Sequence, residues 1–179
     1  MKKLLKVLLV LMTVVSIAGC SSKTTTEKAT KKTKTLSGNY QVEIKVKDYG
    51  TIYAEIDADT APITVTNFVK LSKEKFYDGL TFHRIIDGFM IQGGDPKGDG
   101  TGGSKETIKG EFSDNGVKNP LSHTRGALSM ARSQDNDSAS SQFFIVQSDS
   151  TYLDGQYAVF GYVYEGMDIV DKICDDVQV

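Results

Sequence analysis

From residue 39 onward, the chain begins with a regular alternation of apolar and polar residues. Tyr40–Val46 alternates with a period of two, which predicts a strand with one buried face. Asp48-Tyr49-Gly50 predicts a turn, and Thr51–Ile56 predicts a second strand that returns beside the first. The sequence therefore predicts a β-hairpin at the start of the folded region.

The pattern then changes to a helical period. Val65, Phe68 and Val69 form an apolar stripe that only a helix places on one side. Thr60 is expected to cap this helix, and Pro62 suits its first turn, where a missing N–H costs nothing. We expect the helix to cover an end or a face of the sheet.

A second predicted hairpin contains the most unusual residue in the pattern. Thr81–Ile86 and Phe89–Gln92 read as short strands joined by a two-residue turn at Asp87-Gly88, where both residues tolerate positive φ. Alternation places Arg84 on the same face as Phe82. Taken alone, this arginine fits either a pocket rim or a sheet edge with its head group in water.

Six glycines fall within residues 93–103. Gly98, Gly100 and Gly103 match the spacing of a dinucleotide-binding loop, but no helical pattern follows them. The next residues are Ser-Lys, the reverse of the order that a phosphate-binding P-loop needs. We therefore expect a long loop whose glycines permit tight turns and close approach of another backbone.

The last third predicts more short strands and one helix. Residues 128–131, 142–147 and 158–163 read as strands, and the loop 132–141 lacks the spacing of a calcium site. Met167–Cys174 has the apolar stripe of a final helix. Many short strands with two helices predict a mainly β fold, a closed antiparallel β-barrel with two capping helices.

Residues 1–19 resemble an export signal. Lysines precede an apolar run from Val7 to Ala18 that is too short to span a bilayer. The run ends in Ile17-Ala18-Gly19-Cys20, which resembles the bacterial lipobox and implies a diacylglycerol on Cys20. We expect a lipid-anchored protein at the extracytoplasmic face of the cell membrane, since two acyl chains give stable anchoring.

Residues 20–38 form a predicted linker after the lipidated cysteine. Ser, Thr and Lys dominate, and Leu36 is the only large apolar residue, so the segment cannot fold alone. Its five lysines and one glutamate suit either a solvated spacer or contact with an anionic membrane or wall polymer. The domain is expected at residues 39–179.

Charge and composition limit the function of that domain. It carries 13 basic and 22 acidic residues, a net charge of −9, which argues against nucleic-acid binding. Cys174 is its only cysteine, so no disulfide forms within it, and it is expected in the core. Because His83 and His123 have no partners at ligand spacing, we expect no metal and no cofactor.

Together these segments resemble the cyclophilins, peptidyl-prolyl cis-trans isomerases built on an eight-stranded antiparallel barrel closed by two helices. The resemblance covers nearly all of Tyr40–Cys174. Its blocks are Phe82–Ile86, Phe89–Asp95, Gly100–Gly103, Leu128–Ala131, Ser141–Ile145, Leu153–Gly155 and Val159–Gly161, with Pro62, Thr64, Asn67 and Phe68 in the first helix.

The resemblance implies a role for each site residue. Arg84, Phe89 and Gln92 are the implied catalytic residues, with Arg84 donating to the proline nitrogen. The implied substrate-binding residues are Met90, Gly100, Ala131, Arg132, Gln142, Phe144, Tyr152, Leu153 and Tyr157. Ala131 and Arg132 are expected to offer backbone groups to a bound peptide.

The implied activity is rotation of X–Pro bonds in secreted proteins by a monomeric, membrane-tethered folding assistant. A non-catalytic chaperone or surface module that holds proline-containing segments is the alternative, although gripping alone would not need Arg84. The chain lacks convincing nucleophile–base groups, and bond rotation needs none.

Four departures from the family pattern are present. Tyr152 stands where many members have tryptophan, so we expect weak cyclosporin binding. Tyr157 replaces a common histidine and Arg132 a common asparagine, and we expect both to be tolerated. Only five residues follow the last helix stripe, too few for the family's final strand, so the hypothesis is a shortened fragment whose first strand keeps an unpaired edge.

Overall fold

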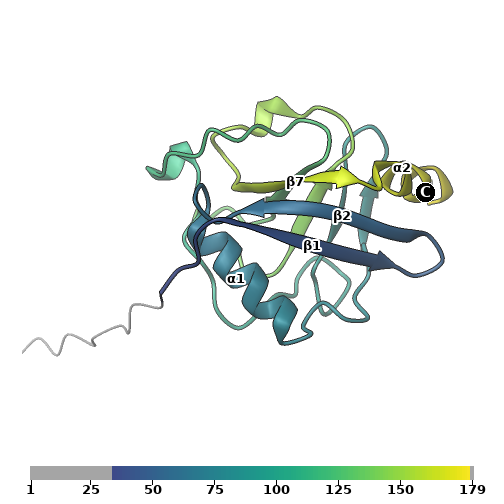
Figure 1. The fold of residues 1–179 in the computed structure, drawn as a ribbon, viewed down its shortest axis with the longest axis horizontal. Coiled ribbons are helices and arrows are strands. Elements are labelled where there is room, and N and C mark those ends of the chain that lie inside the picture. Colours follow the sequence, from purple (N-terminus) through teal and green to yellow (C-terminus); the bar gives the residue numbers. More distant parts are fainter. Residues whose placement is uncertain (1–33, 178–179) are drawn as a thin grey trace, which may run out of the picture. The chain divides into compact units, whose positions relative to one another are not determined.

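The computed structural model describes residues 34–177 (Figure 1). Seven antiparallel strands form one sheet in the order β1-β2-β7-β5-β6-β4-β3. The strands are β1 (Asn39–Val46), β2 (Gly50–Asp57), β3 (Arg84–Ile86), β4 (Met90–Gly93), β5 (Ala127–Met130), β6 (Phe143–Val146) and β7 (Val159–Glu165). The helices are α1 (Pro62–Lys73) and α2 (Met167–Asp176), with single-turn 3₁₀ helices η1 (Ser113–Asn115) and η2 (Thr151–Leu153).

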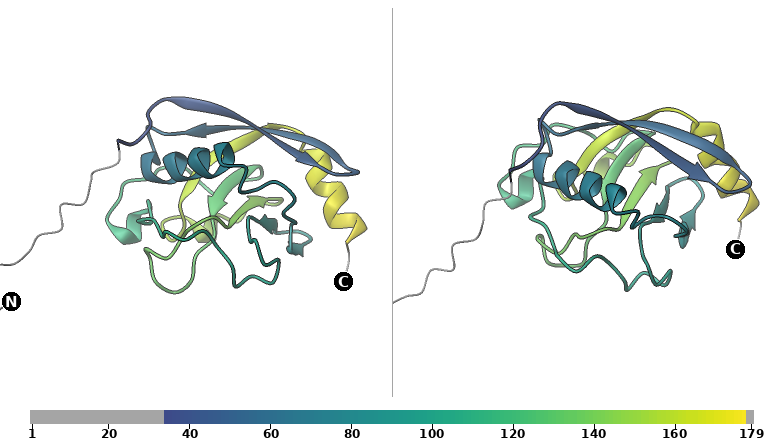
Figure 2. Two further views of the ribbon diagram at one scale, coloured as in Figure 1. Left: turned by 90° about the horizontal axis from the view of Figure 1, so that it is seen from below. Right: turned by 60° about the horizontal axis from the view of Figure 1, so that its bottom comes forward.

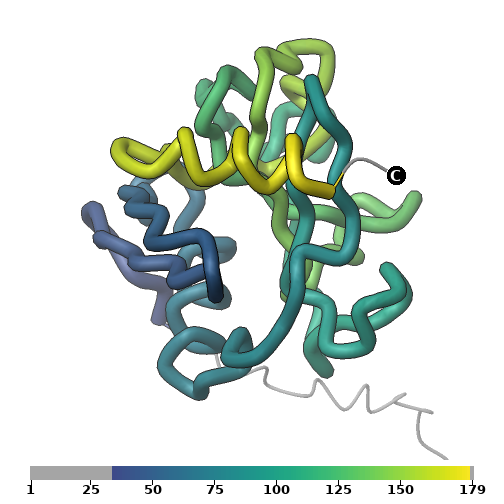
Figure 3. The backbone as a smooth tube through the Cα atoms, turned by 90° about the vertical axis from the view of Figure 1, so that its right-hand side faces the viewer, coloured from purple at the N-terminus to yellow at the C-terminus, as the bar shows by residue number. Residues whose placement is uncertain are grey.

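The two helices cover different parts of the curved sheet. α1 lies beneath β1 and β2 in Figure 2, where Val65 and Phe68 enter the main core. Figure 3 shows α2 lying across the end of the sheet, and it contacts β2 and β3. Cys174 is buried on this helix, as its place in the apolar stripe predicts. The mainly β architecture with two helices is therefore confirmed.

Closure of the sheet differs from the expectation. β1 and β3 are its two edges, and they do not pair with each other in residues 34–177. A cavity of about 780 Å³ lies beside the outer edge of β1, lined by apolar side chains that include Val42, Ile44 and Phe82. The sheet curves as a barrel does, but in the part of the chain that the structure describes, backbone hydrogen bonds do not close it.

The start of α1 corrects a sequence prediction. Thr60 does not cap the helix, because its hydroxyl and its N–H both donate to Asp57. The buried carboxylate of Glu111 instead accepts the N–H groups of Ile63 and Thr64, at 3.0 and 2.8 Å. A carboxylate suits the positive end of a helix, and here it comes from far along the chain.

The turn of the second hairpin also differs from the prediction. Ile86 pairs with Met90, so three residues form the turn instead of two. Gly88 has a φ of +74°, whereas Asp87 does not have a positive φ. The N–H of Phe89 donates to the carbonyl of Ile86 at 3.1 Å, which closes the turn. Only one residue therefore needed the conformational freedom of glycine.

The end of the predicted linker is attached to the domain. The N–H of Leu36 donates to the Thr66 hydroxyl at 2.8 Å, and its side chain packs against the core. This end of the predicted linker is therefore held against the domain, because the leucine finds an apolar site. The signal at 1–19, Cys20 and most of the linker lie outside the described residues. No helix among residues 34–177 is long and apolar enough to cross a bilayer.

Candidate active site

Strand alternation divides the sheet between two apolar clusters. In β6 the side chains of Phe143 and Ile145 belong to the main core, whereas Phe144 and Val146 belong to a second, smaller cluster. This second cluster lies on the opposite face of the sheet. Its members are Met90, Ala127, Phe144, Val146 and Val159, with Phe89, Leu121, Ala131, Leu153, Tyr157 and Tyr162 packed against them.

Arg84 stands beside this cluster at the edge of the sheet. It is exposed at the start of β3 and pairs with Gln92 of β4. Its Nη1 donates to Oε1 of Gln92 at 3.3 Å and lies 3.9 Å from the sulfur of Met90. Among the described residues Arg84 forms no ion pair. The guanidinium is therefore a charged donor next to an apolar surface.

A chain of amide groups connects Arg84 to the glycine-rich loop. Nε2 of Gln92 donates to Oε1 of Gln142 at 2.8 Å. Nε2 of Gln142 donates in turn to the carbonyls of Gly100 and Gly102, at 3.1 and 2.7 Å. Each amide accepts from one side and donates to the other, so the orientation of both glutamines is fixed.

A buried carboxylate holds the loop itself. Asp95 accepts the N–H groups of Lys97 and Gly100, at 2.8 and 2.6 Å. Burial would raise the pKa of Asp95, but hydrogen bonds from the loop amides outweigh burial and lower its pKa. A Cβ on Gly102 would overlap Oδ1 of Asp95, so the loop can take this shape only with glycine at this position.

One side of the site is formed by the β3–β4 turn, which contains Phe89, and by η2, which contains Tyr152 and Leu153. The rings of Phe89 and Tyr152 lie 6.2 Å apart, and Tyr152 is 66% exposed. Leu153 follows in η2 and packs against the second cluster. These side chains bring an apolar wall to the same face as Met90 and Phe144.

Arg132 and Tyr157 form the opposite side. The guanidinium of Arg132 lies 4.7 Å from the ring centre of Tyr157 and 5.2 Å from that of Phe112. Arg132 also donates to the carbonyls of Gln156 and Ser133, so its side chain is held in one position. Tyr157 meets the ring of Phe144 edge-on, with centres 6.1 Å apart.

The structure thus brings the candidate residues onto one face. Contacts connect eight of them as described: Arg84, Met90, Gln92, Gly100, Gln142, Phe144, Arg132 and Tyr157. The N–H of Ala131 donates to the carbonyl of Gln142 at 3.0 Å, so this N–H is already used within the protein. We expected Ala131 to lend backbone to a peptide, and only its carbonyl remains for that purpose.

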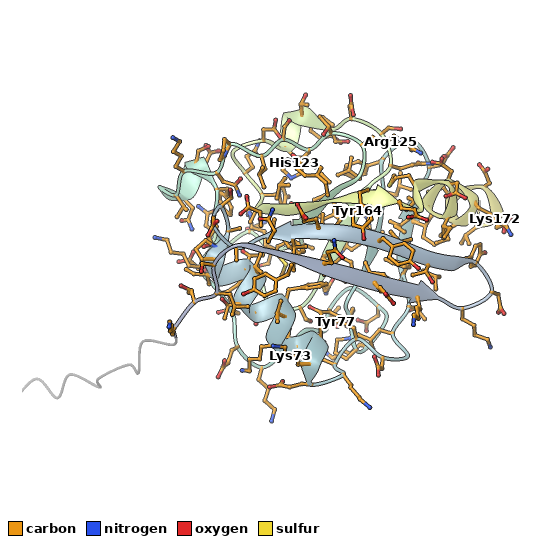
Figure 4. All side chains as sticks on the ribbon, viewed as in Figure 1. Lys73, Tyr77, His123, Arg125, Tyr164 and Lys172 are labelled. Carbon is orange, nitrogen blue, oxygen red and sulfur yellow. The ribbon has the colours of Figure 1, made fainter. Side chains whose placement is uncertain are left out.

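Sequence reasoning missed two residues behind the site. His123 is fully buried and lies on the same side of β7 as Arg125 in Figure 4. Its Nδ1 is 2.7 Å from Oδ1 of Asp154, and its ring stacks on that of Phe144. The only signal in the sequence was a lone histidine beside a predicted strand. In residues 34–177, no group of three His, Cys, Asp or Glu residues could hold a metal ion.

The chain matches a known family over most of its length. The sequence model described as "Cyclophilin type peptidyl-prolyl cis-trans isomerase/CLD" matches residues 41–179. "Peptidyl-prolyl cis-trans isomerase B" of Bacillus subtilis (strain 168) is 49% identical over 128 residues, covering 72% of this chain and 86% of that protein. The "Peptidyl-prolyl cis-trans isomerase" of Helicobacter pylori (strain ATCC 700392 / 26695) is 44% identical over 142 residues, covering 78% and 77%.

A solved structure shares the fold. The Cryptosporidium parvum cyclophilin type peptidyl-prolyl cis-trans isomerase, crystallised in the presence of the dipeptide ala-pro, superposes with a TM-score of 0.70 at 33% sequence identity. The match covers 76% of this chain and 85% of that one. The architecture and the sequence blocks therefore point to the same family.

Proposed function

The chain belongs to the cyclophilin-type peptidyl-prolyl cis-trans isomerases, and we propose that it serves secreted proteins from a lipid anchor on Cys20. It is an isomerase, as its relatives are. The proposal concerns where it works, which chains it acts on and which residues do the chemistry. Its substrates would be proline-containing segments of proteins that fold outside the cytoplasm.

One observation carries the assignment of the chemistry. The guanidinium of Arg84 is exposed beside the apolar cluster of Met90 and Phe144, and within residues 34–177 it forms no ion pair. An X–Pro amide rotates over a barrier of about 18–20 kcal/mol because its C–N bond has partial double-bond character. A donor that reaches the proline nitrogen favours a lone pair localised there, which removes that double-bond character.

The surrounding residues would hold the substrate while it rotates. Apolar walls from Phe89, Phe144 and Leu153 suit a pyrrolidine ring, and they exclude water so that the charge of Arg84 acts more strongly. Gln92 keeps Arg84 in place and Gln142 connects it to the loop at Gly100. Such a site fits the twisted amide better than the planar one. Lowering the barrier by about 6 kcal/mol would accelerate rotation by roughly 10⁴-fold.

The location rests on the sequence before residue 34. A short apolar run ending in Ile17-Ala18-Gly19-Cys20 supports export and lipidation. The lysine-rich segment that follows supports a spacer between membrane and domain. The Cryptosporidium structure was determined with an Ala-Pro dipeptide, which supports proline-containing peptides as the substrate class. We propose a monomer that binds cyclosporin weakly.

We also propose that the sheet closes as a barrel when a further strand lies along the outer edge of β1. The outer edge of β1 is unpaired within residues 34–177, and together with the apolar cavity beside Val42 and Ile44 it supports this closed form. If the domain unfolded as cooperatively, and at the same temperature, with and without such a strand, closure would play no part in its stability.

Exchange spectroscopy on an Ala-Pro peptide tests the function. The domain from Lys34 onward should give exchange cross-peaks between the cis and trans forms, and Arg84→Ala should remove them while its spectrum stays dispersed. Absence of exchange with a dispersed wild-type spectrum would favour a proline-binding module instead. The lipid anchor is tested by labelling cells with a lipid precursor. The protein should be labelled in the wild type and should not be labelled in Cys20→Ser.

A further inference from the structure

A buried imidazole lies directly behind the floor of the proposed proline pocket. His123 has no exposed surface, and its ring stacks on Phe144 with centres 6.0 Å apart and planes 14° apart. The ring of Tyr157 meets it edge-on at 6.4 Å and 83°. His123 therefore contacts two of the aromatic rings that form the substrate face.

Both ring nitrogens of His123 have partners. Nδ1 lies 2.7 Å from Oδ1 of Asp154, and Nε2 lies 3.0 Å from the hydroxyl of Ser129. Asp154 also accepts the backbone N–H of His123 and the hydroxyl of Ser122. The imidazole is thus held at both ends, and its plane cannot rotate without breaking a hydrogen bond.

The protonation states define the direction of these bonds. Burial lowers the pKa of His123, so its ring is neutral at neutral pH. Burial would raise the pKa of Asp154, but the bonds from Ser122 and His123 outweigh it and lower the pKa. An ionised Asp154 can only accept, so Nδ1 carries the proton and Nε2 accepts from the Ser129 hydroxyl.

Serine, histidine and aspartate in this order are also the residue types of a hydrolase triad. Ser129 is completely buried in β5, so its hydroxyl cannot meet a substrate carbonyl. Nucleophilic chemistry is therefore not what this arrangement offers. Its contacts lead instead to Phe144 and Tyr157.

We propose that His123 is a positioning residue for proline isomerisation, held in one tautomer by Asp154 and Ser129 so that it fixes the rings of Phe144 and Tyr157. The inference rests on the proposed function, since it assigns a support to the same pocket. A planar ring stacked at 14° resists tilting of Phe144, and small displacements in a catalytic site can be costly. Asp154 follows Leu153 directly, so the same carboxylate also anchors the turn that brings Leu153 to the pocket.

His123→Asn is the informative substitution. The asparagine amide nitrogen stands as far from Cβ as Nδ1 does, so it can still donate to Asp154 while the stacked ring is lost. We expect kcat for an Ala-Pro peptide to fall about tenfold, with a smaller change in KM. Val170→Ala is the matched control, because Val170 is fully buried in α2 and belongs to the main core, away from these rings.

The measurement combines exchange spectroscopy with imidazole ¹⁵N shifts in the full chain. Support requires a protonated Nδ1 in the wild type, and a lower kcat in His123→Asn than in Val170→Ala at equal folded fraction. Equal kcat in the two variants, or a protonated Nε2, would overturn the inference. If His123→Asn does not fold, Asp154→Ala replaces it, because alanine removes the acceptor of the Nδ1 proton. An unchanged kcat in Asp154→Ala would overturn the inference as well. Absence of exchange in the wild type would instead refute the proposed function.

Discussion

Arg84 and Gln92 face each other across the β3–β4 pair, with Nη1 of Arg84 3.3 Å from Oε1 of Gln92. The contact sets the orientation of the glutamine, because its other amide atom must then donate to Gln142. A neutral amide holds the guanidinium without cancelling its charge. The identity of residue 92 should therefore control how well Arg84 can act on a substrate.

Gln92→Glu should reduce kcat/KM by about tenfold or more while the fold persists. A carboxylate at this position would pair with Arg84 and draw its charge away from the substrate, and it could no longer donate to Gln142. Exchange rates on an Ala-Pro peptide measure the effect. Gln41→Glu on exposed β1 makes the same charge change away from the site, and an equal loss there would show that net charge alone is responsible.

Gly102→Ala should weaken substrate binding through the glycine-rich loop. The new Cβ would displace the carboxylate of Asp95, which holds the N–H groups of Lys97 and Gly100. We expect KM to rise several-fold, about the effect of one or two lost hydrogen bonds. Kinetics and urea denaturation should be measured together. Lower stability with unchanged KM would mean that the loop does not contribute to binding.

Much of the fold could be predicted because its periodicities are local. The alternation in Tyr40–Val46 and the helical stripe at Val65 and Phe68 depend on neighbours only a few residues away, and both elements formed as predicted. The cap of α1 could not be predicted in the same way. Glu111 reaches the helix from 47 residues away, and no local pattern connects the two.

The same difference between local patterns and long-range contacts applies to the site. One hairpin contains both Arg84 and Gln92, so their proximity could be predicted locally. Their catalytic roles, like those of the more distant rings, come from the resemblance to a family and stay predictions. His123 and Asp154 were missed because their contact spans 31 positions and leaves no periodic trace. A buried polar pair is a tertiary feature, so only the assembled structure could reveal it.

Arg125→Lys should cost under about 1 kcal/mol of stability, and the loss should shrink in high salt. Arg125 binds both carboxylate oxygens of Asp171 on α2, at 2.8 and 2.6 Å, and lysine cannot reproduce that fork. Both side chains are about two-fifths exposed, which limits the value of the pair. Denaturant midpoints in low and high salt check this. A loss that grew with salt would contradict an electrostatic origin.

Tyr152→Trp should tighten cyclosporin binding by about tenfold, since a larger ring beside Phe89 adds apolar contact. The wild type should bind more weakly than the nanomolar range because Tyr152 stands where tryptophan is common in the family. Calorimetry on both proteins decides this. Tyr164 is also an exposed tyrosine, but it lies on β7, so Tyr164→Trp is the control that should leave the affinity unchanged.

Stability should fall in two steps as the pH is lowered. Burial holds the pKa of His123 below its ordinary 6.5, so the unfolded chain binds the proton first and stability falls as the pH drops from 6.5 toward the folded pKa. Asp154 has its pKa lowered below 3.8, burial notwithstanding, by bonds from Ser122 and His123. Its contribution is present above pH 3.8 and is lost as the pH falls through the folded pKa.

His123→Asn separates the two steps. Without the imidazole of residue 123, the denaturant midpoint should stay level between pH 7 and the onset of carboxylate protonation, whereas the wild type should decline across that range. Urea titrations at several pH values measure both curves. If the two proteins declined in parallel below pH 6.5, the upper step would belong to another group, and His123 would not be kept neutral by burial.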